Sequence, residues 1–154
     1  MKVLFVCLGN ICRSPTAEAV LRQQLADAGI KDLAVDSAGT AAYHVGNPPD
    51  SRAMQAGRRR GYDFTGLKAR QLMAEDFTAF DFILAMDEDN LSNINKIKPA
   101  NSIAKVLLAA EFSERNFRSV PDPYYGGASG FEEVLDMCES IAQGIIAYHC
   151  KGDC

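Results

Sequence analysis

Lys2-Val-Leu-Phe-Val-Cys-Leu-Gly-Asn-Ile-Cys-Arg-Ser-Pro15 is the stretch of sequence that decides the fold. Residues 2–7 are almost wholly apolar, which is typical of a β-strand buried on both faces of a sheet. A turn over residues 8–13 follows, and Ser14 is the candidate N-cap of a helix that has Pro15 at its first position. A strand, a tight loop and a helix in this order predict the first unit of a parallel sheet that is covered by helices.

The rest of the chain alternates strand-like and helix-like patterns in the same way. Further buried strands are predicted at residues 33–35, 82–86 and 103–108. Helices are predicted at residues 14–29, 51–60, 74–80 and 87–98, and a last one begins near Gly130. The sequence therefore predicts a single α/β domain over residues 1–154, with a short parallel four-stranded sheet flanked by helices on both faces.

Residues 111–130 have little periodicity and contain Pro121, Pro123 and three glycines. This composition predicts a long surface loop. Long loops of this kind are often functional.

Composition and charge limit the classes of function. The chain has 154 residues, 47% hydrophobic and 23% charged, with a formal net charge of −4. An acidic chain does not favour nonspecific nucleic-acid binding. Its longest apolar run near the start, residues 3–8, is too short for membrane insertion. Five irregularly spaced cysteines do not suggest a secreted disulfide framework, so we expect a cytoplasmic protein.

Four residues of the first loop suit a phosphate site. Backbone N–H groups at a helix N-terminus converge on one point and, with the helix dipole, bind anions. The same field favours the thiolate form of Cys7, which is the nucleophilic form. The planar guanidinium of Arg13 can hold two phosphoryl oxygens. Gly9 allows close approach to the anion, and Asn10 tolerates a left-handed turn.

Two motifs at opposite ends of the chain resemble those of one family. Val6-Cys-Leu-Gly-Asn-Ile-Cys-Arg-Ser-Pro-Thr-Ala-Glu18 resembles the phosphate-binding loop of the low-molecular-weight protein-tyrosine phosphatases, and Asp122-Pro-Tyr-Tyr-Gly126 resembles their general-acid loop. The motifs that match between them are Asp36-Ser-Ala-Gly-Thr40, Gly46-Asn-Pro-Pro-Asp50, Ala69-Arg-Gln71 and Met86-Asp-Glu88. The resemblance covers essentially the whole chain.

The resemblance implies a two-step hydrolysis of phosphotyrosine in a protein substrate, without a metal or another cofactor. Cys7 takes the phosphoryl group while Arg13 and the loop amides hold its oxygens. Asp122 protonates the phenolate and then activates the water that releases inorganic phosphate. The loop residues with this binding role are Leu8, Gly9, Asn10, Ile11 and Cys12.

The resemblance also implies supporting roles around the loop. Ser14 donates a hydrogen bond to the Cys7 sulfur, while Asn10 and Ser37 hold the loop in shape. Cys12 would form a reversible disulfide with Cys7 under peroxide.

The walls of the cleft are expected to select the substrate. By resemblance, Tyr43, Tyr124 and Tyr125 line it, and flat aromatic walls favour phosphotyrosine over the shorter phosphoserine. Relatives that act on phosphoarginine typically carry threonine at the position of Ile11, so the isoleucine favours an aryl phosphate.

One family feature is missing from the sequence. Asp87 resembles a residue that supports the loop, but its usual histidine partner is absent, because Gly66 or Leu67 stands near that position. Asp87 is therefore not counted among the catalytic residues.

Three alternatives stay open. Arsenate reduction on this scaffold needs a closely spaced cysteine pair in the middle of the chain, and no cysteine lies between Cys12 and Cys138. A phosphoarginine phosphatase would use the same loop. A non-catalytic phosphate-binding module would keep Arg13, but it would need neither Cys7 nor Asp122.

Overall fold

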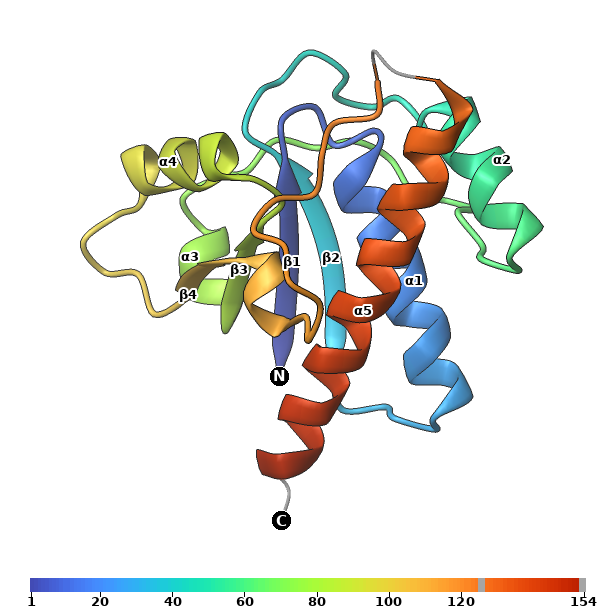
Figure 1. The fold of residues 1–154 in the computed structure, drawn as a ribbon. Helices are drawn as coiled ribbons and strands as arrows, with labels where there is room; N and C mark the ends of the chain where they lie inside the picture. Colours follow the sequence, from blue (N-terminus) through green and yellow to red (C-terminus); the bar gives the residue numbers. More distant parts are fainter. Residues whose placement is uncertain (125–126, 153–154) are drawn as a thin grey trace.

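The computed structural model describes residues 1–124 and 127–152. Its centre is a sheet of four parallel strands in the order β2-β1-β3-β4 (Figure 1). The strands are β1 (Lys2–Cys7), β2 (Ala34–Gly39), β3 (Phe82–Ala85) and β4 (Lys105–Leu108). This sheet confirms the predicted fold class.

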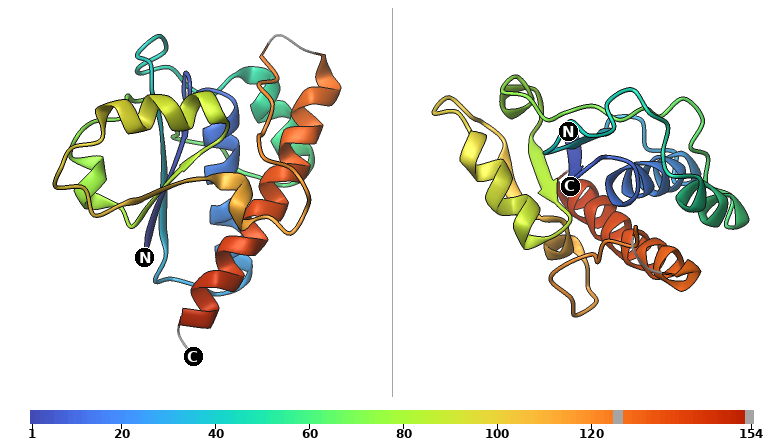
Figure 2. Two further views of the ribbon diagram at one scale, coloured as in Figure 1. Left: turned by 60° about the vertical axis from the view of Figure 1, so that its left-hand side comes forward. Right: turned by 90° about the horizontal axis from the view of Figure 1, so that it is seen from above.

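Helices cover both faces of the sheet, as Figures 1 and 2 show. They are α1 (Arg13–Asp27), α2 (Ser51–Arg59), α3 (Asp76–Ala79), α4 (Glu88–Ile97) and α5 (Ala128–Gly152), with a short 3-10 helix η1 (Ala109–Phe112). The helices α1 and α5 lie side by side on one face, while α3 and α4 lie on the other. The N-terminus and the last turns of α5 lie at the end of the sheet away from the β1–α1 loop (Figure 1).

The alternation of side chains along β1 divides the core between these faces. Val3 and Phe5 belong to the hydrophobic cluster that includes α1 and α5. Leu4 and Val6 belong to the cluster that includes α3 and α4. All four are at most 1% exposed, and burying each contributes about 1.5–3 kcal/mol. The central strand is thereby fixed from both sides, and it holds Cys7 at its carboxyl end.

The second strand is longer than its apolar pattern predicts. It includes Asp36, Ser37 and Gly39, which pair in parallel with β1 as far as Cys7. The predicted strand ended at residue 35 because the pattern of apolar residues stops at Val35. The strand continues because Ser37 is buried in a hydrogen-bond network instead of facing solvent.

The start of α1 also differs from the prediction. Ser14 is not its N-cap: the helix begins at Arg13, and Cys12 precedes it without a side-chain cap hydrogen bond. The Ser14 hydroxyl is buried and turned toward Cys7. A side-chain cap would occupy N–H groups of the first turn, so its absence leaves them for an anion.

The predicted loop over residues 111–130 is shorter at both ends, because η1 extends into it and α5 begins at Ala128. It is not wholly on the surface. Val120 is fully buried, and its N–H donates to the carbonyl of Met86 at 2.8 Å. This contact ties the loop to the end of β3, beside the site.

Within residues 1–124 and 127–152, even the long helix α5 falls short of the apolar character that a membrane span requires.

Candidate active site

The loop between β1 and α1 folds around the sulfur of Cys7. Asn10 has a positive φ of 58°, and its backbone N–H donates to Cys7 Sγ at 3.3 Å. Gly39 of β2 lies directly against the loop: a Cβ there would be 2.8 Å from the Leu8 carbonyl oxygen and 3.1 Å from the Asn10 nitrogen. The loop therefore depends on a left-handed residue and on a neighbour without a side chain.

The side chain of Asn10 is the centre of a buried network whose hydrogen-bond directions can be assigned. The backbone N–H of Arg70 donates to Asn10 Oδ1 at 3.0 Å, which fixes the orientation of the amide. Asn10 Nδ2 therefore donates to Ser14 Oγ at 2.8 Å and to Ser37 Oγ at 2.9 Å. Because Ser14 Oγ accepts one hydrogen bond, its own hydrogen is available for another acceptor.

The nearest acceptor for it is the sulfur of Cys7 in its thiolate form, which has no hydrogen to donate. Ser14 Oγ lies 3.0 Å from Cys7 Sγ, closer than the 3.4 Å that separates it from the carbonyl of Ala38. The network thus places the Ser14 hydroxyl beside the Cys7 sulfur. Asn10, Ser14 and Ser37, which we predicted to support the loop, share this one hydrogen-bond network.

The far end of the network is a buried carboxyl group. Ser37 Oγ donates to Glu18 Oε1 at 2.7 Å, and Glu18 forms an ion pair with Arg22 at 2.5 Å. Burial raises the pKa of Glu18, and the contacts with Ser37 and Arg22 offset this only partly. Sequence reasoning placed Glu18 inside the loop motif but gave it no role.

Arg13 is buried, and three oxygen atoms hold its guanidinium. Its Nη1 donates to Asp87 Oδ2 at 2.5 Å and to the carbonyl of Val120 at 3.1 Å, while Nη2 lies 3.6 Å from Asp122 Oδ2. Burial opposes its charge, but Cys7, Asp87 and Asp122 outweigh burial and raise the pKa of Arg13. The cation is therefore oriented and permanent beside the sulfur.

Asp87, which we had not counted, is thus a direct partner of Arg13. It also caps α4, since Asp87 Oδ1 accepts the backbone N–H of Asn90 at 2.7 Å. The sequence placed Asp87 directly after a predicted buried strand, which hinted at a role near the loop. It did not reveal that Arg13 is the partner of Asp87. The histidine that the family has near Gly66 or Leu67 is missing here. From this part of the chain, the backbone N–H of Arg70 donates to Asn10.

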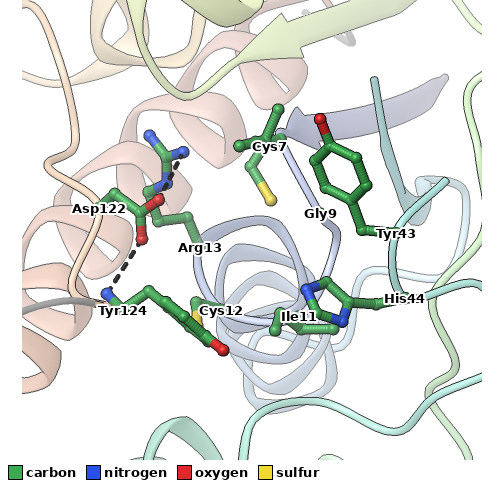
Figure 3. Close-up of a pocket in the computed structure, with 10 residues that line it drawn as sticks. Cys7, Gly9, Ile11, Cys12, Arg13, Tyr43, His44, Asp122 and Tyr124 are labelled. Carbon is green, nitrogen blue, oxygen red and sulfur yellow. Dashed lines mark hydrogen bonds and ion pairs between the residues drawn. The ribbon is translucent and has the colours of Figure 1, made fainter. Parts of the chain in front are cut away.

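Cys7 and Arg13 line a pocket of about 290 Å³, shown in Figure 3. Its lining comprises Cys7, Leu8, Gly9, Ile11, Cys12, Arg13, Tyr43, His44, Asp122 and Tyr124. The Cys7 sulfur points into the space between Tyr43 on one side and the Asp122 segment on the other. The structure therefore brings together the predicted nucleophile, arginine and acid from the two ends of the chain.

The aromatic wall is only partly as predicted. Tyr43 and Tyr124 line the pocket, whereas Tyr125 lies outside the described residues. His44 was missed: its ring centroid is 6.5 Å from those of both Tyr43 and Tyr124. A lone histidine in a loop carries no sequence signal for this position.

Asp122 sits at the mouth of the pocket, with its side chain 35% exposed. Its Oδ1 accepts the backbone N–H of Tyr124 at 3.0 Å, while Oδ2 faces Arg13 (Figure 3). One carboxylate oxygen is therefore held by the turn, and the other is directed toward the pocket.

Cys12, the second thiol of the loop, has surroundings that disfavour its thiolate form. Burial, together with the negative groups Asp50, Cys7 and Asp122, raises the pKa of Cys12 to about 12. Cys12 therefore stays a neutral thiol at physiological pH.

Comparisons with known proteins identify the family of the chain. The sequence profile described as "Low molecular weight phosphotyrosine protein phosphatase" matches residues 2–150. The chain is 50% identical over 149 residues to the enzyme of that name from Schizosaccharomyces pombe, with 95% of each chain covered. A protein tyrosine phosphatase from Entamoeba histolytica has the same fold, with a TM-score of 0.93 and 40% identity over 100% of this chain and 99% of that chain. An arginine phosphatase from Drosophila has a TM-score of 0.90 and 32% identity over 97% and 98% of the two chains.

The match extends over nearly the whole chain, and it includes the loop around Cys7 and the segment around Asp122. The chain belongs to the low molecular weight phosphotyrosine protein phosphatase family.

Proposed function

We propose that this protein is a protein-tyrosine phosphatase that hydrolyses phosphotyrosine in protein substrates, and small aryl phosphates, through a phosphocysteine intermediate on Cys7. The observation that carries the proposal is the meeting of Cys7, Arg13 and Asp122 in one pocket. A module that only binds phosphate needs no proton donor 3.6 Å from its arginine.

The first step is phosphoryl transfer to sulfur. The Cys7 thiolate attacks phosphorus in line, so that an S–P bond forms as the P–O bond to the aryl group breaks. Arg13 and the loop amides hold the phosphoryl oxygens, where negative charge spreads in the transition state. Asp122, in its acid form, gives its proton to the aryl oxygen, and a neutral phenol leaves.

The second step returns the enzyme. A water molecule attacks the phosphorus of phosphocysteine and gives its proton to the Asp122 carboxylate. The P–S bond breaks, and inorganic phosphate leaves. The Ser14 hydroxyl, 3.0 Å from Cys7 Sγ, stabilises the thiolate that departs from phosphorus, because a hydrogen bond to a charged group is stronger than one to a neutral group.

Two features favour an aryl ester as the substrate. Tyr43 and Tyr124 give the pocket aromatic walls on which a phenyl ring stacks. Ile11 presents an apolar side chain in the loop, where a threonine would favour phosphoarginine. The three buried cysteines Cys7, Cys12 and Cys138 form no disulfide bond, which supports the cytoplasm as the location we propose.

The test compares phosphotyrosine and phosphoarginine peptides of the same sequence, with and without a chelator. We expect hydrolysis of the phosphotyrosine peptide to be faster and unaffected by the chelator. Preference for phosphoarginine would contradict the proposed substrate, and arsenate-dependent oxidation of thioredoxin would support a reductase instead.

A second arm tests the acid. Asp122→Asn removes the proton donor with little change in size, so we expect a larger loss of kcat/KM for esters of weakly acidic phenols than for p-nitrophenyl phosphate. Equal losses across leaving groups would remove Asp122 from this role.

A further inference from the structure

Arg52, in the first turn of α2, lies over two aromatic rings from separate parts of the chain. Its Cζ is 5.3 Å from the ring centroid of Tyr124 and 4.9 Å from that of Phe131. A guanidinium is attracted to the face of an aromatic ring within about 6 Å of its centroid. Tyr124 lies two residues after Asp122, in what we call the acid segment (residues 121–124), and Phe131 is a buried residue of α5. Arg52 thus links the acid segment to the helical framework.

The guanidinium has a fixed orientation. Its Nε donates to Asp50 Oδ1 at 3.1 Å and its Nη2 to Asp50 Oδ2 at 3.0 Å, so the two groups form a two-pronged pair. Asp50 is tied to the phosphate loop in turn, because its backbone N–H donates to the carbonyl of Ile11 at 2.7 Å. The contacts therefore run without a break from the phosphate loop through Asp50 and Arg52 to the Tyr124 ring.

Arg52 itself is not among the residues that line the pocket, whereas Tyr124 is. Tyr124 also shares a tight turn with Asp122, whose Oδ1 accepts its backbone N–H. The contact through which Arg52 reaches the aryl group of a substrate is therefore the Tyr124 ring.

Building on the proposed function, we propose that Arg52 is a positioning residue for substrate selection: it holds the Tyr124 ring in the wall of the pocket and thereby sets the affinity for the aryl group. The phosphate loop binds the phosphoryl group without it.

Lysine cannot replace this arginine. A lysine ammonium keeps the positive charge but lacks both the planar face that stacks on a ring and the fork that engages Asp50. We therefore expect Arg52→Lys to behave more like Arg52→Met than like the wild type.

The experiment measures two quantities in each variant: kcat/KM for a phosphotyrosine peptide and the inhibition constant of inorganic phosphate. Phosphate occupies the loop but has no aryl group to contact Tyr124. We expect Arg52→Met to lower kcat/KM about fivefold and to leave the inhibition constant of phosphate unchanged. Arg58→Met, which removes an exposed arginine of the same helix, is the matched control and should change neither quantity.

A double-mutant cycle with Tyr124→Leu identifies the path of the effect. If Arg52 acts through the Tyr124 ring, Arg52→Met causes no further loss in the Tyr124→Leu background. An equal loss in both backgrounds would overturn the proposal, as would an inhibition constant of phosphate that rises with the loss of kcat/KM. If the wild type hydrolyses the peptide and Arg52→Met does so equally well, only the role of Arg52 is overturned. If the wild type does not hydrolyse the peptide, the proposed function itself is contradicted.

Discussion

At Cys7, a hydrogen bond from the Ser14 hydroxyl stabilises negative charge on the sulfur. The backbone N–H of Arg70 fixes the amide of Asn10, the amide donates to Ser14 Oγ, and a Cys7 thiolate, which has no hydrogen of its own, accepts from the Ser14 hydroxyl. The side chains of Asn10, Ser14 and Cys7 are nearly inaccessible to water, so solvent cannot replace a lost hydrogen-bond partner. Removing one donor therefore acts on the charge of the sulfur directly.

Ser14→Ala tests this at the second chemical step. We expect hydrolysis of the phosphoenzyme to slow by about 10-fold or more, because a hydrogen bond to a charged group contributes about 1.5–3 kcal/mol. Formation of the phosphoenzyme should slow less, since sulfur is then losing charge. Rapid-quench kinetics measure the two steps separately, and an equal effect on both would contradict the assignment.

At the scale of elements, the phosphate loop is a product of the parallel sheet. β1 delivers Cys7, α1 delivers Arg13, and β2 runs so close that Gly39 contacts the loop backbone. The sequence predicted β1 and α1 well, because both carry strong local patterns. It predicted only the start of β2, since Asp36 and Ser37 break the apolar pattern while serving the site.

Gly39→Ala tests the contact between β2 and the loop. The added Cβ would meet backbone atoms, at 2.8 Å for the Leu8 carbonyl oxygen, and backbone cannot turn aside as a side chain can. Overpacking of this kind costs about 1–3 kcal/mol. We expect kcat/KM to fall at least about 10-fold and phosphate binding to weaken in parallel.

Gly127→Ala is the control, because a Cβ there meets no atom of residues 1–124 and 127–152 within 4 Å. An active Gly39→Ala variant with unchanged phosphate affinity would show that the loop tolerates the contact.

The whole molecule joins residues that no local pattern connects. Asp122 could be assigned from sequence only through the family resemblance, because an aspartate before proline is otherwise a common turn residue. Asp87 contacts Arg13 from the end of β3, and His44 lines the pocket from a loop. Only the family resemblance linked Asp87 to the support of the loop, and no sequence feature gave His44 a role. Ser14 was misread as a cap because its hydroxyl has a partner in another element, at the end of β1.

The buried carboxyl of Glu18 makes the stability of the whole domain depend on pH. Because burial raises its pKa above the ordinary value of 4.5, the native state holds this proton to higher pH than the unfolded chain does. The native state then binds more protons, so the contribution of Glu18 to the free energy of unfolding falls as pH rises above about 4.5. Below that pH both states are protonated and the contribution is constant.

Glu18→Gln removes this titration. We expect the wild type to lose stability relative to Glu18→Gln as the pH is raised from 4 to 7, measured by urea unfolding. Glu133→Gln, which changes an exposed carboxyl of α5, should show no such trend. A wild type that gains stability relative to Glu18→Gln over this range would contradict the account.

The most direct test of the central claim is to locate the phosphoryl group during turnover. Enzyme mixed with p-nitrophenyl phosphate is quenched in acid within the first turnover, digested, and mapped by mass spectrometry. Our account predicts a phosphoryl group on Cys7, increased by Ser14→Ala and absent from Cys7→Ser, which still binds phosphate. Turnover that persists in Cys7→Ser, or a phosphoryl group found on another residue, would contradict it.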